Sequence, residues 1–110
     1  IAKGQGVGRG SVVGKTVVAN SASDLEGVDL SESVIVTNSV DETLVPYIEQ
    51  AVGLITEENG ITSPSAIIGL EKSIPTIIGV ENATKELKDG ILVTVDAAQG
   101  KIFEGYANVL

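Results

Sequence analysis

The sequence predicts one α/β domain with a mixed β-sheet and short helices. The chain has 110 residues, the ordinary size of a single domain. Its apolar content of 43% is almost entirely aliphatic, with only 3% aromatic residues, and β-branched aliphatic side chains favour strands. Short β-branched runs alternate with short helical patterns through the middle of the chain. Such alternation indicates a layered α/β domain of two or three layers.

Glycine dominates the first ten residues, at positions 4, 6, 8 and 10. This spacing could form a nucleotide-binding loop, but that fingerprint needs a strand before it and a helix after it. The residues that follow, Ser11–Ala19, instead predict a strand or a hairpin around Gly14 and Lys15. We therefore expect residues 1–10 to be a flexible linker and residues 11–110 to form the domain.

The next segments predict a loop, a strand, a helix and a second strand. Residues 20–33 are polar and acidic, typical of a loop with room for one helical turn. Residues 34–37 form a β-branched run, as expected of a buried strand. Asp41 is placed to cap a helix whose apolar face would end before Gly53, where residues 54–56 predict a strand. The apolar positions of that helix would be Leu44, Val45, Ile48 and Val52.

A turn over residues 57–60 precedes a second helix. Ser63 is its expected N-cap and Pro64 its first helical residue, a common pairing at helix starts. The apolar stripe of this helix would be Ala66, Ile67 and Leu70. Further on, the patterns predict a strand at 76–78, a helical turn at 82–87, and a hairpin from the strands 91–96 and 101–104.

Charge and missing residue types exclude several functions. A net charge of -8 argues against nucleic acid and against an anionic membrane as partners, because both need basic surfaces. The chain contains no His and no Cys, which removes imidazole bases, phosphohistidine, thiolates and soft metal ligands. We expect no metal and no cofactor. It also lacks Met, so we expect either a processed product or a piece of a longer protein.

Residues 60–79 resemble the mobile phosphohistidine domain of phosphoenolpyruvate-utilising enzymes. That family includes pyruvate phosphate dikinase, phosphoenolpyruvate synthase and the first enzyme of the phosphotransferase system. The resemblance extends over roughly residues 10–105 and implies the swivelling β/β/α fold. The matching positions are Gly60, Thr62, Ser63, Ala66, Ile67, Glu71, Ile74, Pro75 and Gly79.

Two positions depart from the family pattern. Pro64 stands where the family carries its phosphoryl-accepting histidine, and Leu70 stands where it carries an arginine. Proline offers no nucleophile, and leucine cannot pair the charge of a phosphoryl group as a guanidinium does. The resemblance therefore implies no catalytic residue in this chain.

This altered form resembles the extra C-terminal domain of pyruvate kinases of the Bacillus and Staphylococcus type. The resemblance implies a cytoplasmic, glycolytic parent enzyme that transfers a phosphoryl group from phosphoenolpyruvate to ADP with Mg²⁺ and K⁺. The partners of the domain would be the rest of the pyruvate kinase chain and neighbouring subunits. Its role would be structural stabilisation, subunit contact or regulation.

Two other functions remain open at this point. Thr62 and Ser63, with free N–H groups at the helix start, could hold a phosphate or sulfate. Against this, Ser63 can be a simple cap, Pro64 removes a donor, and the acids at 57 and 58 repel anions. Carboxylate catalysis would rest on the pairs 41/42 and 57/58, but adjacent acids in polar turns are typical of solvated surface. Asp96 is expected to form a turn.

Overall fold

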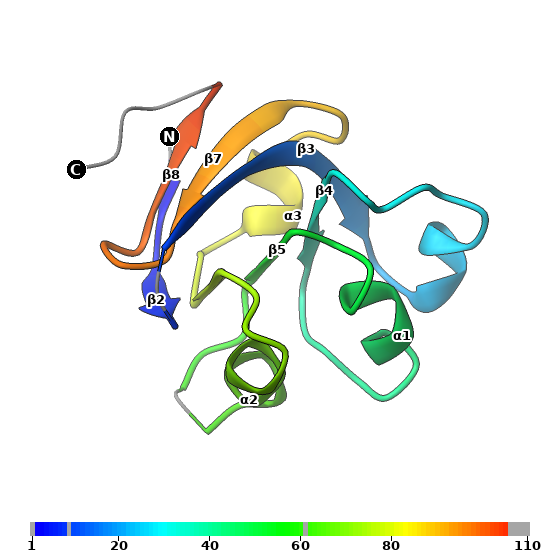
Figure 1. Ribbon diagram of the computed structural model, residues 1–110, viewed down its shortest axis with the longest axis horizontal. Coiled ribbons are helices and arrows are strands. Elements are labelled where there is room, and N and C mark those ends of the chain that lie inside the picture. The colour runs from blue at the N-terminus through cyan, green and yellow to red at the C-terminus, as the bar shows by residue number, and fades with distance from the viewer. Residues whose placement is uncertain (1, 9, 61, 106–110) are drawn as a thin grey trace.

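The computed structural model describes residues 2–8, 10–60 and 62–105. Within them, one sheet has the strand order β1-β8-β7-β3-β4-β5-β6-β2 (Figure 1). Strands β3, β4, β5 and β6 pair in parallel and the remaining pairs are antiparallel, so the predicted mixed sheet is confirmed. The strands are β1 (Ala2–Lys3), β2 (Gln5–Val7), β3 (Ser11–Ala19), β4 (Ser33–Thr37), β5 (Gly53–Thr56), β6 (Thr76–Ile78), β7 (Leu92–Asp96) and β8 (Lys101–Glu104).

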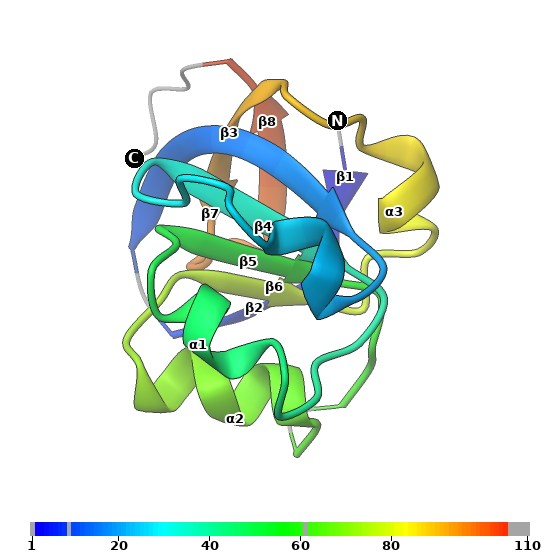
Figure 2. The same ribbon diagram turned by 90° about the vertical axis from the view of Figure 1, so that its right-hand side faces the viewer.

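Short helices complete the α/β fold. Helices α1 and α2 lie beside one another on one side of the parallel strands, whereas α3 lies on another side, near β1 (Figure 2). A single turn of 3-10 helix, η1, follows β3 within the predicted polar loop. The bounds are η1 (Ala22–Leu25), α1 (Val45–Ile48), α2 (Pro64–Glu71) and α3 (Ala83–Glu86).

The central strands β4, β5 and β6 are buried on both faces. In β4, Ile35 belongs to the core cluster that contains Leu44 and Ile48 of the α1 region. Val34 and Val36 point the other way, into a cluster that contains Leu87 beside α3. All five residues of β4 are buried, which confirms the strand predicted at 34–37 and explains its lack of polar alternation.

The two edges of the sheet meet at Gly4. Strands β1 and β2 lie at opposite ends of the strand order, yet one residue separates them in sequence. The edges of a flat sheet of this size would lie about 33 Å apart, seven spacings of about 4.8 Å, but one residue spans only about 3.5 Å. The sheet must therefore curl until its edges meet, and the Gly4 N–H donates to the Gly100 carbonyl at 2.8 Å.

This arrangement corrects the flexible linker predicted for residues 1–10. A Cβ on Gly4 would lie 2.3 Å from the Ile78 carbonyl oxygen, and one on Gly6 would lie 1.7 Å from that of Ala97. The glycines at 4 and 6 serve close backbone packing rather than flexibility. Residues 1 and 9 of the expected linker lie outside the described residues.

The structure settles one open alternative and corrects one prediction. Residues 11–19 form one continuous strand, which confirms the predicted strand rather than the hairpin, and a Cβ on Gly14 would lie 2.8 Å from the Glu32 carbonyl oxygen. Asp41 does not cap α1, which begins at Val45 after the N-cap Leu44. The Asp41 carboxylate instead accepts the Thr43 N–H at 2.9 Å, a bond across two residues that forms a local turn.

Replacing Gly6 with Ala should destabilise the domain strongly. The new methyl group would meet the backbone oxygen of Ala97, which no side-chain rotation can relieve. We expect Gly6→Ala to lower the free energy of unfolding by about 3 kcal/mol, measured by equilibrium denaturation. The neighbouring exposed Gln5→Ala is the control and should change it by less than about 0.5 kcal/mol. Equal effects for the two variants would contradict the tight closure.

Candidate functional site: the start of helix α2

Helix α2 begins as the sequence predicts. Ser63 is its N-cap, and the Ser63 Oγ accepts the Ala66 N–H at 3.3 Å. Pro64 follows as the first helical residue and its side chain is exposed. The cap is present, but the position after it carries a ring with no nucleophilic atom.

The side-chain carboxylate of Glu58 binds at the N-terminal end of this helix. Its Oε1 accepts the Ser65 N–H at 3.0 Å and the Ser65 hydroxyl at 2.5 Å. Because Pro64 has no N–H, Ser65 provides the first N–H donor of the helix. The positive end of the helix dipole favours a carboxylate at this place. Glu58 is thus an internal anion at the position where an external anion would bind.

The anion-binding hypothesis for Thr62 and Ser63 requires free N–H groups at the helix start. The N–H groups of Ser65 and Ala66 donate to Glu58 and to the Ser63 Oγ, and the Ile67 N–H donates to the Ser63 carbonyl at 3.0 Å. Thr62 is exposed beside them. The donors on which the hypothesis relies are therefore already bound to protein acceptors.

The adjacent acid Glu57 ties three segments together. Its Oε2 accepts the Thr84 N–H at 2.8 Å and the Thr84 hydroxyl at 2.6 Å. Its Oε1 accepts from the Asn38 side-chain amide at 2.8 Å. These hydrogen bonds lower the pKa of the Glu57 carboxyl, and the bond from the Thr84 hydroxyl has the largest effect. The prediction that the pair 57/58 is simply solvated is wrong, because Glu57 holds α3 and Glu58 holds α2.

The predicted apolar stripe of α2 is also wrong in part. Ala66 is buried, but Ile67 and Leu70 are 47% and 55% exposed. A Cβ on Gly69 would lie 2.4 Å from the Thr76 Oγ1, so α2 lies very close to β6. The absence of a side chain at Gly69 allows this close approach. The buried residues of α2 are Ser65, Ala66, Ile68 and Gly69.

The remaining candidate residues lie apart from this helix start. Asp96 is 1% exposed at the end of β7, where its Oδ1 accepts the Gln99 N–H at 3.2 Å, as expected of a turn residue. Asp41 and Glu42 are exposed and line a groove between α1 and α2. Within the described part of the chain, no group of three or more potential metal ligands occurs.

Fold and site together define the class of protein. The chain combines a mixed sheet and short helices with a capped helix start that follows a glycine turn and carries Pro64 at its first position. The family model for the PEP-utilising enzyme, mobile domain, matches residues 30–100, and the chain belongs to this family.

Curated relatives narrow the resemblance to pyruvate kinases. The chain is 80% identical over its 110 residues to a pyruvate kinase of Staphylococcus epidermidis, 78% to one of Staphylococcus saprophyticus and 74% to one of Staphylococcus aureus. Each match covers 100% of this chain but only 19% of the relative. The chain therefore spans about a fifth of the length of these relatives and corresponds to one domain of each.

Solved structures support the fold. Aconitase X of Thermococcus kodakaraensis in its holo-form is 20% identical, with a TM-score of 0.72 over 96% of this chain and 98% of that one. At this identity the likeness shows the fold alone. An Enzyme I (nEIt) solution structure is 28% identical, with a TM-score of 0.57 over 71% of this chain and 34% of that one. No helix among the described residues is long and apolar enough to span a membrane.

Removing the Glu58 carboxylate should weaken the start of α2. Glu58→Ala leaves the buried Ser65 N–H and hydroxyl without this acceptor, so we expect the free energy of unfolding to fall by about 1 kcal/mol. Equilibrium denaturation measures the change. The control Glu71→Ala removes the same charge from an exposed position at the end of α2 and should be nearly neutral. If the two variants were equally stable, the capping role of Glu58 would be refuted.

Proposed function

We propose that this chain is a non-catalytic domain appended to a pyruvate kinase. The parent enzyme transfers a phosphoryl group from phosphoenolpyruvate to ADP in glycolysis, in the cytoplasm, using Mg²⁺ and K⁺ bound outside this chain. The domain contributes structural stability, subunit contact or regulation. Support comes from the likeness of the chain to pyruvate kinases and from the share of their length that it spans.

The observation that carries the non-catalytic role is the start of α2. A phosphoryl acceptor there needs a nucleophile and a nearby cation. Pro64 provides no nucleophile, and Glu58 brings a negative charge to the same helix end. The buried Ser65 hydroxyl is bonded to that carboxylate. No His occurs anywhere in the sequence to replace the missing acceptor.

The alternative function is a residual phosphate or sulfate site at Thr62 and Ser63. It would need the N–H donors that Glu58 and the Ser63 Oγ hold. An incoming anion would also meet the charge of Glu58 at close range. We therefore favour a role through contact, with the rest of the kinase chain and neighbouring subunits as partners.

The test compares the full-length parent kinase with the same enzyme truncated before this domain. We expect the truncated enzyme to keep phosphoryl transfer from phosphoenolpyruvate to ADP, because the chemistry lies elsewhere. We expect it to lose thermal stability, subunit assembly or effector response. Turnover, thermal unfolding, sedimentation and effector titration measure these properties.

Two results would count against the proposal. Loss of phosphoryl transfer in an otherwise stable and assembled truncated enzyme would assign chemistry to the domain. Unchanged stability, assembly and effector response would remove its contact role. Phosphate titration of the full-length enzyme, followed at the Ser65 and Ala66 amide resonances, tests the alternative phosphate site. We expect no chemical-shift change at these two amides.

A further inference from the structure

Helix α2 exposes an unusual amount of apolar side chain. Ile67 and Leu70 are 47% and 55% exposed, and Val28 at 38% is the third large apolar side chain exposed among the described residues. Pro64, Ile67 and Leu70 follow one another at intervals of three residues, so they share the outer face of the helix. Contiguous apolar surface of this kind, rimmed by polar groups, marks interaction sites in soluble proteins.

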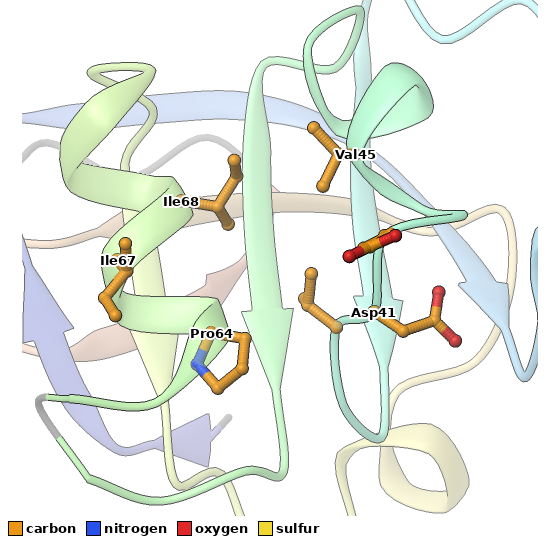
Figure 3. A pocket seen from close by; sticks show the side chains of 7 residues that line it. Asp41, Val45, Pro64, Ile67 and Ile68 are labelled. Carbon is orange, nitrogen blue, oxygen red and sulfur yellow. The ribbon is translucent and has the colours of Figure 1, made fainter.

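A groove of about 420 Å³ runs beside this face, between α2 and the α1 region. Pro64, Ile67 and Ile68 form one wall, and Val45 lies on the other with Asp41 (Figure 3). Val40 and Glu42 complete the lining. The groove is therefore apolar inside and carries two carboxylates on one side.

Both charged side chains that line the groove are carboxylates, Asp41 and Glu42. Asp41 and Glu42 are both exposed, and Glu71 follows Leu70 on α2. The nearest cation on the helix, Lys72, already pairs with Glu49 at 2.8 Å. Hydrogen bonds from Thr43 lower the pKa of Asp41, so its carboxylate is charged at neutral pH. An occupant must match both the apolar lining and the acidic rim.

We infer that this groove is the docking site for an apolar segment flanked by Lys or Arg, contributed by the rest of the parent kinase chain. One or two aliphatic or aromatic side chains would fill the space between Val45 and Ile67, and the basic residues would face Asp41 and Glu42. The inference rests on the proposed function. The chain spans 19% of its relatives, so about four fifths of such a parent lies outside it and can supply the segment.

Pro64 and Leu70 contribute to the apolar character of the exposed face of α2. Pro64 and Leu70, which depart from the family pattern, both lie on the exposed side of α2. Proline and leucine suit a dry contact, because neither leaves a polar group unpaired when water is removed. The face that carries no phosphoryl chemistry is thus chemically suited to burial against a partner.

Site-specific photo-crosslinking in the full-length enzyme tests the inference. A benzoylphenylalanine probe replaces Leu70, which lies beside the groove but does not line it, and crosslinked peptides are identified by mass spectrometry. We expect one discrete segment of the parent chain, with Lys or Arg next to its apolar residues. A probe at Val28, exposed near η1, serves as the control for non-specific crosslinking.

Variants that remove charge then test whether Asp41 and Glu42 contribute to docking. Asp41→Asn with Glu42→Gln keeps side-chain size, and we expect the yield of the Leu70 crosslink to fall about two- to fivefold. Glu26→Gln, an exposed acid beside η1, should leave the yield unchanged. Ile67→Ser should reduce the yield further, since Ile67 lines the groove.

Several outcomes would overturn the inference. These are crosslinks to another copy of the same helix face, crosslinks to unrelated proteins, no discrete crosslink, or a yield insensitive to Ile67→Ser. The proposed function can survive them, because it fails only if truncation of the domain abolishes turnover or changes nothing. The two claims therefore fail separately.

Discussion

Closure of the sheet by residues 2–7 is the constraint on which the rest of the structure depends. Strands β1 and β2 pair with β8 and β6, and one residue joins them. At Gly4 and Gly6 the neighbouring backbone lies so close that there is no room for a Cβ atom. The absence of side chains at two positions thus lets the sheet curl until its two edge strands, β1 and β2, are joined by a single residue.

The closure also positions the candidate site. Val7 of β2, Ile78 of β6 and Ala66 of α2 form one buried cluster. Helix α2 then lies on β6 with Gly69 against Thr76, and its buried side also carries Ser65, Ala66 and Ile68. The helix start is held by Ser63 and Glu58, two acceptors from the chain itself. The N–H groups of Ser65 and Ala66 at the helix start therefore have protein acceptors, and Ile67 and Leu70 are exposed on the outer surface.

Sequence reasoning was most reliable where a local pattern determines the structure. The buried run at 34–37, the Ser63 cap with Pro64 after it, and the C-terminal hairpin depend on neighbours in sequence and are confirmed. Failures occurred where distant segments decide the outcome. The glycines at 4 and 6 indicate a linker unless Ile78 and Ala97 are known to lie against them. Likewise, Glu58 resembles a solvated acid until Ser65, seven residues later, is placed beside it.

Residues 2–7 are thus part of the fold, and through β2 they pack against α2. Amide hydrogen exchange at Gly4 tests this, since the Gly4 N–H donates to the Gly100 carbonyl across the closure. We expect the Gly4 amide to be protected to the same degree as amides in the central strands, because opening it requires breaking the sheet. Exchange at the rate of an unstructured peptide, with the central strands still protected, would show that residues 2–7 are not part of the fold.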